Sequence, residues 1–159
     1  MSFDKYSRRT FLKMKNFINE VKSDELDELK TIAEIYNFYI QNFEFPVDKI
    51  FLTNSLQDKN FKIFVYENDS IKGFCGIYLY PEFETAEIGP IATDKKFLNT
   101  HIGSKLLEYT LNFAKKSNVR KCTARVLDKN LTALKFFTDN EFILETNANS
   151  IVYFVKYLI

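Results

Sequence analysis

The sequence predicts one mixed α/β (α+β) domain over residues 1–159, with a mixed central sheet covered by helices on both faces. With 159 residues, 46% hydrophobic and 27% charged, the chain is long enough to bury one full core. Segments with strand and helix periodicity follow one another in the order β-α-α-β-β-β-α-β-α-β-β. Such an order builds a sheet with packed helices, and no repeat, linker or low-complexity segment divides it.

The first third of the chain is expected to contain two helices. Ser23 and Asp24 can cap the first helix. Its apolar stripe comprises Leu26, Leu29, Ala33, Tyr36 and Ile40. Pro46 ends this region, and residues 47–56 are expected to form a second, shorter helix. The opening residues 1–17 lack the apolar segment of a secretory signal and are compatible with an extra strand or an ordered arm.

Strands are predicted on either side of the most informative segment. Residues 61–67 alternate as a strand, 68–70 form a turn, and 71–80 form the return strand. The next strand, residues 86–93, is interrupted by Gly89-Pro90. Proline removes a ladder donor and glycine weakens pairing, so this strand should contain a bulge or a splayed end. Later strands are expected at 121–127 and 150–158.

A helix is predicted to begin near Thr100 or His101. Its apolar face consists of Ile102, Leu106, Tyr109 and Phe113. The first turn of a helix leaves N–H groups unpaired at the positive end of the macrodipole, so it suits an anion such as a pyrophosphate. Gly103 would let such a ligand approach the backbone closely.

The loop before this helix resembles the pyrophosphate-binding motif of the GNAT superfamily of acyl-CoA-dependent N-acyltransferases. The family pattern is Q/R-x-x-G-x-G/A, in which backbone amides hold the pyrophosphate of coenzyme A. Of this pattern only the last glycine, Gly103, is retained. Leu98 stands where Gln or Arg is usual, and His101 stands where the first Gly is usual. The resemblance implies that the cofactor contacts Leu98, Asn99, Thr100, His101, Ile102, Gly103 and Ser104.

A second family motif follows at the expected separation. The pattern N-x-x-A-x-x-F-Y-x-x-x-G-F is matched at Asn130, Ala133, Phe136 and Phe142. Phe137 replaces the Tyr that often protonates the leaving thiolate, and Glu141 replaces the Gly. Two imperfect motifs in the right order are more specific than either one, and together they imply a GNAT-like, splayed central sheet.

The mechanism implied by the resemblance is direct acetyl transfer from acetyl-CoA. Strands 86–93 and 121–127 would splay, and the pantetheine arm would lie between them, bonded to backbone over Ile91, Ala92 and Thr93. Asn130, Phe136 and Phe137 would flank the same arm.

Glu87 is the candidate base, since family members often carry one on this strand; the alternative is an ordinary surface carboxylate. Tyr78, Tyr80 and Glu84 are expected near the acceptor side. Because Phe137 cannot donate a proton, water or another Tyr protonates the thiolate, or it departs unassisted, which its thiol pKa of about 8.5 allows.

Composition argues against several other classes of function. The net charge of +1 without a basic stripe argues against nucleic-acid binding, and no apolar run reaches the ~18 residues of a membrane span. The two cysteines, Cys75 and Cys122, lack metal-ligand spacing and are expected to be buried and reduced, as in a cytoplasmic protein. No metal is expected, and with His101 as the single histidine a hydrolase triad is set aside.

Three functional hypotheses remain open at this stage. The first is an N-acetyltransferase acting on a primary amine of a small molecule or peptide. The second is a catalytically weak GNAT-fold sensor or scaffold that binds acyl-CoA, which the departures at Leu98, His101 and Phe137 favour. The third is an unrelated α/β module without a cofactor. A homodimer is compatible with the sequence, and the acceptor cannot be read from it.

Overall fold

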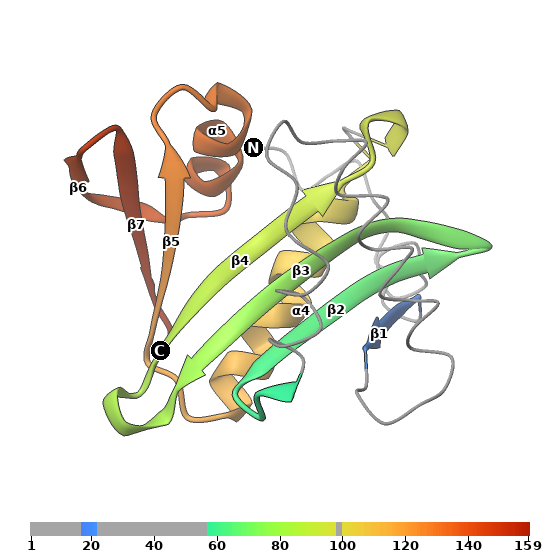
Figure 1. Cartoon of the computed structure of the whole chain (residues 1–159), viewed down its shortest axis with the longest axis horizontal. Coiled ribbons are helices and arrows are strands. Elements are labelled where there is room, and N and C mark those ends of the chain that lie inside the picture. Colours follow the sequence, from blue (N-terminus) through green and yellow to red (C-terminus); the bar gives the residue numbers. More distant parts are fainter. Residues whose placement is uncertain (1–16, 22–56, 98–99) are drawn as a thin grey trace.

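A seven-stranded sheet forms the centre of the protein (Figure 1). The computed structural model describes residues 17–21, 57–97 and 100–159. The strands are β1 (Ile18–Glu20), β2 (Phe61–Asn68), β3 (Ser70–Tyr80), β4 (Thr85–Thr93), β5 (Lys121–Leu127), β6 (Ile143–Ala148) and β7 (Ile151–Tyr157). They lie in the order β1-β2-β3-β4-β5-β7-β6, and every neighbouring pair is antiparallel except β4–β5.

Two α-helices pack on this sheet within the described residues, α4 (Ile102–Lys116) and α5 (Leu131–Asp139). Two short 3-10 helices, η2 (Pro81–Phe83) and η3 (Lys95–Phe97), flank β4. The mixed α/β fold class is therefore confirmed. The two helices predicted between residues 24 and 56 lie outside the described part of the chain, as does most of the opening arm. No helix in the described part is long and apolar enough to cross a membrane.

The break predicted in β4 occurs at Gly89-Pro90. Ile88 pairs with Ile77 and Ile91 with Cys75, so Gly89 and Pro90 together lie opposite Gly76 in a bulge. A Cβ atom on Gly76 would lie 2.7 Å from the Gly89 carbonyl oxygen, and Gly89 itself adopts φ 144°. Both positions therefore require glycine.

β4 and β5 separate beyond this bulge. Their parallel pairing covers only Thr85–Ile88 against Lys121–Ala124. β4 then continues to Thr93 along β3, whereas β5 continues to Leu127 along β7. The splayed sheet implied by the family resemblance is therefore present (Figure 1).

One apolar core lies between the sheet and the two helices. α4 buries Leu106, Leu107 and Ala114. Helix α5 contributes Phe137, whose ring stacks on Phe154 of β7 at a centroid distance of 5.8 Å. This packing fixes both helices beside the splayed ends of β4 and β5.

Candidate active site

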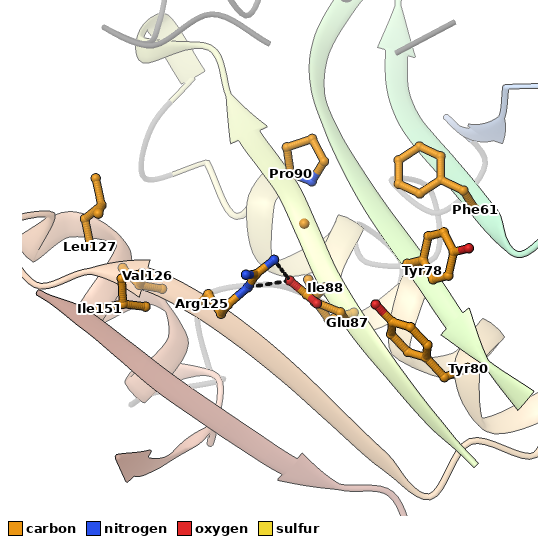
Figure 2. A pocket seen from close by; sticks show the side chains of 11 residues that line it. Phe61, Tyr78, Tyr80, Glu87, Ile88, Pro90, Arg125, Val126, Leu127 and Ile151 are labelled. Carbon is orange, nitrogen blue, oxygen red and sulfur yellow. Dashed lines mark hydrogen bonds and ion pairs between the residues drawn. The ribbon is translucent and has the colours of Figure 1, made fainter. Parts of the chain in front are cut away.

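A pocket of about 510 Å³ lies where β4 and β5 separate (Figure 2). Its walls come from both splayed strands and from β2 and β3. Phe61, Tyr78 and Glu87 form one row across the sheet, because Phe61 pairs with Tyr78 and Tyr78 with Glu87. Leu127 of β5 and Ile151 of β7 line the opposite wall. The pocket thus has an aromatic wall, an aliphatic wall and the Glu87 carboxylate between them.

Glu87 forms an ion pair with Arg125 inside this pocket. Arg125 Nε donates to Glu87 Oε1 at 2.7 Å, and Nη2 lies 2.6 Å from the same oxygen. The Glu87 side chain is 28% exposed and that of Arg125 58% exposed. The two side chains point toward each other across the strand gap (Figure 2). Glu87 is therefore a half-buried carboxylate facing the pocket rather than an isolated surface charge.

Arg125 was not predicted from the sequence as a site residue. The alternation of residues 121–127 did place it on the face opposite Cys122, Ala124 and Val126, which are buried. That signal was available, but it does not reveal that Arg125 meets Glu87, which depends on the register of β4 against β5.

Tyr78 is held by Asp58 at the edge of the pocket. The Tyr78 hydroxyl donates to Asp58 Oδ2 at 2.5 Å. This bond raises the pKa of Tyr78 and lowers the pKa of Asp58 from their usual values. Because its proton is directed to Asp58, Tyr78 is a poor proton donor to a ligand. Tyr80, with its ring centroid 5.0 Å from that of Tyr78, is the second phenol among the described residues that line the pocket.

Glu84 does not line this pocket, although it was expected near the acceptor side. It follows η2 with φ 53°, and its carboxylate lies 3.0 Å from Arg120 Nε. The side chains of Glu84 and Arg120 are 51% and 80% exposed. This ion pair is a surface feature outside the pocket.

The free edge of β4 offers backbone groups to the strand gap. Asp94, the residue after β4, donates its N–H to the carbonyl of Lys72 in β3, so this N–H points toward β3. Backbone groups of alternate residues in an antiparallel ladder point to opposite sides. Ile91 and Thr93 therefore direct theirs toward β5, which no longer pairs there, whereas Ala92 directs its groups toward β3. An extended pantetheine arm fits an edge of this kind.

Helix α4 begins at Ile102, one residue after His101 and two after Thr100, the two predicted starts. His101 occupies the N-cap position in the left-handed conformation, with φ 65°, and its carbonyl accepts the first helical bond from Lys105 N–H at 2.9 Å. This conformation is the one that the usual glycine adopts without strain. The Thr100 hydroxyl donates to the Phe97 carbonyl oxygen. Leu98 and Asn99 lie outside the described residues.

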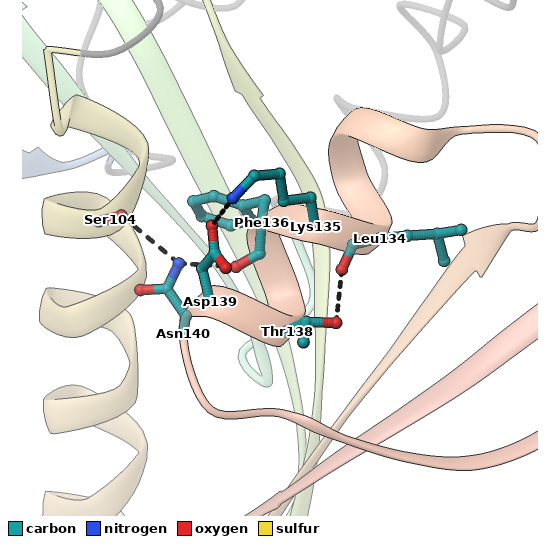
Figure 3. Close-up of polar contacts among 7 residues, drawn as sticks. All are labelled: Ser104, Leu134, Lys135, Phe136, Thr138, Asp139 and Asn140. Atoms are coloured by element: carbon teal, nitrogen blue, oxygen red, sulfur yellow. Dashed lines mark hydrogen bonds and ion pairs between the residues drawn. The ribbon is translucent and has the colours of Figure 1, made fainter. Parts of the chain in front are cut away.

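Gly103 lies where α4, β4 and α5 meet. A Cβ atom there would lie 3.0 Å from Thr93 Oγ1 and 3.3 Å from the Phe136 ring. On the next residue, the Ser104 hydroxyl accepts from Asn140 Nδ2 at 3.4 Å and links the two helices (Figure 3). Gly103 thus has a packing role that the sequence did not predict, whereas its contact with phosphate remains a prediction.

The residues of the second motif mainly hold α5 in place. Asn130 caps the helix, with its side-chain oxygen accepting from Ala133 N–H at 3.1 Å. Phe137 is 3% exposed, and its ring lies 5.1 Å from that of Phe142 and 5.3 Å from that of Phe136. Glu141, where the pattern has glycine, adopts φ 66°. The substituted chain therefore keeps the backbone conformation typical of glycine at that turn.

The comparisons with known proteins agree with this architecture. The family model described as Acetyltransferase (GNAT) family matches residues 26–142. The chain therefore belongs to the GNAT acetyltransferase family, and it is an acyl-CoA-dependent N-acyltransferase. No curated protein matches the sequence significantly.

Solved structures of similar fold include three acetyltransferases. The ribosomal-protein-S18-alanine N-acetyltransferase from Escherichia coli has a TM-score of 0.72 at 16% identity, covering 88% of this chain and 93% of that one. Ard1 from Thermoplasma volcanium has a TM-score of 0.74 at 17% identity, with coverages of 89% and 97%. PaiA N-acetyltransferase from Thermoplasma acidophilum, solved with coenzyme A, has a TM-score of 0.69 at 17% identity, with coverages of 89% and 99%. At these identities the likeness concerns the fold.

Proposed function

We propose that this protein moves an acetyl group from acetyl-CoA to a primary amine of a small-molecule or peptide acceptor by direct transfer. The observation that supports this most strongly is the position of the Glu87 pocket. Its walls include residues of both β4 and β5 at the point where these strands separate. An acceptor in the pocket would therefore meet an acyl donor held along the free edge of β4.

The residues present fit coenzyme A. The free edge of β4 supplies backbone groups of Ile91 and Thr93, and the first turn of α4 supplies N–H groups at Ile102, Gly103 and Ser104. When bound, acetyl-CoA supplies an activated thioester. An amide N–H of Ile91 or Thr93 would polarise its carbonyl as an oxyanion hole does.

Glu87 is the group best placed to accept a proton from the amine. Amine attack requires the neutral form, and the pocket holds this carboxylate with Oε2 outside both contacts to Arg125. The proton can pass to Glu87 directly or through water. Arg125 would hold the carboxylate toward the acceptor through its two contacts to Oε1.

Departure of the thiolate does not require a proton donor at position 137. A thiol with a pKa of about 8.5 is a fair leaving group near neutral pH. If a phenol protonates the departing thiolate, Tyr80 is the better candidate of the two described tyrosines in the pocket, since Tyr78 donates its proton to Asp58. The substitution at Phe137 also supports the second candidate, a weakly active acyl-CoA sensor.

We further infer a cytoplasmic location, because free buried thiols suit a reducing compartment.

A panel of primary amines incubated with the whole protein and acetyl-CoA tests this function. Acetylation of at least one amine, with stoichiometric release of the coenzyme A thiol, is the expected result. Binding of acetyl-CoA without turnover of any amine would favour the sensor. Absence of both binding and turnover would contradict the proposal and the sensor alternative together.

A further inference from the structure

We propose that the acceptor is a free amino acid, or a close aminocarboxylate, with an apolar side chain. Arg125 would bind its carboxylate, and Glu87 would bind its amine. This inference rests on the proposed acetyl transfer to an amine and names the substrate class for the same pocket.

The charges of the pocket complement those of an amino acid, because its negative charge (Glu87) can meet an ammonium group and its positive charge (Arg125) can meet a carboxylate. Among the described residues that line it, the charged ones are Glu87 and Arg125. A simple amine in its protonated form would be matched by Glu87 but repelled by the neighbouring guanidinium. An acceptor whose own carboxylate lies beside its amine complements both groups at once.

The ion pair leaves binding groups unused. Both Arg125 contacts reach Oε1 of Glu87, so they do not engage Oε2. A guanidinium has five N–H donors, and the two contacts through Nε and Nη2 do not use all of them. It binds carboxylates with two parallel N–H donors in one plane. Because the Arg125 side chain is 58% exposed, its remaining donors are accessible to a ligand in the pocket.

The position of Arg125 suits recognition close to the reacting amine. It directly follows Ala124, the last residue of β5 that pairs with β4, and so it stands where the strands separate. Glu87 lies beside it on β4. The carboxylate and amine of an α-amino acid are separated by one carbon. The neighbouring Arg125 guanidinium and Glu87 carboxylate can therefore bind both groups of one molecule.

The rest of the pocket suits an apolar side chain. Tyr78 and Tyr80 form one wall, and Asp58 fixes the orientation of Tyr78. Leu127 and Ile151 contribute the aliphatic side. Leu127 is 54% exposed, so its side chain offers apolar surface to a ligand in the pocket.

The proposed reaction converts the amino acid into its N-acetyl derivative. The amine nitrogen forms a bond to the acetyl carbonyl carbon, and the C–S bond breaks with its electron pair on sulfur. The amine proton passes to Glu87 or water, and the thiolate takes up a proton from solvent. No other co-reactant is required.

The test compares acceptors that differ only at the carboxylate. The whole protein is assayed with acetyl-CoA and L-phenylalanine, L-phenylalaninamide or 2-phenylethylamine, and the N-acetyl products are quantified by mass spectrometry. The leucine series, with leucinamide and 3-methylbutylamine, repeats the comparison. We expect kcat/KM for each free amino acid to exceed that of its amide and its decarboxylated amine by about tenfold or more.

A matched pair of variants identifies the residue responsible. Arg125→Gln should bring the ratio of kcat/KM between phenylalanine and 2-phenylethylamine close to one. Arg120→Gln removes another exposed arginine that is paired with a glutamate, but outside the pocket, and it should leave the ratio unchanged. The wild-type comparison stands even if Arg125→Gln does not fold.

Each other outcome overturns the inference in a distinguishable way. Equal turnover of acids, amides and amines would overturn it and leave the proposed acetyl transfer intact. Faster turnover of peptides that begin with phenylalanine or leucine would assign the pocket to a peptide N-terminus instead. No acetylation of any amine would overturn the proposed function and the inference together.

Discussion

Arg125 contacts Glu87 twice through one carboxylate oxygen, with Nε and Nη2 at 2.7 and 2.6 Å from Oε1. The two residues lie on strands whose last pair is Ile88 of β4 with Ala124 of β5, directly after Glu87 and directly before Arg125. This relationship places a fixed carboxylate at the point where the cofactor arm and the acceptor would meet. It also makes Glu87 the residue whose replacement is most informative.

Glu87→Gln should lower kcat by about a hundredfold, because general-base catalysis contributes about 10²–10⁴-fold. Affinity for acetyl-CoA should stay unchanged, since the proposed pyrophosphate and pantetheine contacts involve α4 and residues 91–93 rather than Glu87. Steady-state rates with an accepted amine and a titration with acetyl-CoA measure the two effects.

Glu84→Gln is the matched control for that change. Glu84 precedes β4, pairs with an arginine and lies outside the pocket. Its replacement should leave kcat unaltered. A Glu87→Gln enzyme as active as the wild type would assign this carboxylate to the surface rather than to catalysis.

Acetyl-CoA should stabilise the folded protein. At a concentration about 100 times its dissociation constant the gain is ~2.7 kcal/mol, by mass action. S-acetylpantetheine lacks the pyrophosphate and should stabilise much less, because the first turn of α4 then has no anion to bind. Thermal melts with and without each ligand provide the measurement, and equal shifts for both would argue against a pyrophosphate site at α4.

Gly103→Val should lower both acetyl-CoA affinity and stability. Its Cβ would crowd Thr93 and the Phe136 ring, and overpacking of this kind costs about 1–3 kcal/mol. Combining it with Phe136→Leu creates space and should recover part of the stability, which urea unfolding of the single and double variants measures.

The same variants separate packing from ligand binding at Gly103. If the double variant regains stability but not acetyl-CoA affinity, while Phe136→Leu alone keeps that affinity, the absence of a side chain at Gly103 matters for the phosphate. Recovery of both would assign Gly103 to helix packing alone. Strictly additive losses would contradict the contact with Phe136.

Features that depend on local chemistry could be predicted from the sequence. The bulge in β4 follows from Gly89-Pro90. The order of the elements followed from strand and helix periodicity, and the splay of strands 86–93 and 121–127 followed from the resemblance to the family. The Glu87 candidate was reached in the same way, and its catalytic role stays a prediction.

Features that depend on strand register and tertiary packing could not be predicted. Glu87 and Arg125 are 38 residues apart, and Asp58 and Tyr78 are 20 apart, so neither contact leaves a local pattern. The contact between Gly103 and Phe136 requires the relative placement of two helices. The contacts of Glu87 and Tyr78 shape the pocket, which explains why its acceptor could not be read from the chain.

The two cysteines should make the protein less stable at high pH. Burial raises the pKa of Cys75 and Cys122 from the usual 9.0 to about 12. Between these values the unfolded thiols lose protons that the folded thiols retain, so the free energy of unfolding falls as pH rises. The limiting slope is about 1.4 kcal/mol per pH unit for each thiol.

Urea unfolding at pH 8, 9.5 and 10.5 measures this dependence, with the Cys75→Ala/Cys122→Ala double variant as control. The control should show a shallower decline than the wild type over that window. Identical slopes would mean that these thiols do not differ in pKa between the folded and unfolded states.

Phe137→Tyr tests whether the residue that replaces the family tyrosine limits the enzyme. The Phe137 ring packs against the rings of Phe136, Phe142 and Phe154. An added hydroxyl that stays among them would lack a hydrogen-bond partner, at a cost of about 1–3 kcal/mol of stability. We therefore expect a lower melting temperature. Turnover should change by less than about threefold, because thiolate departure is already easy near neutral pH.

The opposite result would have a clear structural meaning. If the hydroxyl reaches the strand gap, it becomes solvated and the melting temperature stays unchanged. A proton donor beside the sulfur could then raise kcat by about a hundredfold, provided that thiolate departure limits the rate. Melting temperature and kcat are measured on the same preparation, with Phe142→Tyr as the control for a hydroxyl added elsewhere in this aromatic cluster. A large rise in kcat for Phe137→Tyr alone would identify the protein as a transferase weakened by loss of its acid, and would contradict unassisted departure of the thiolate.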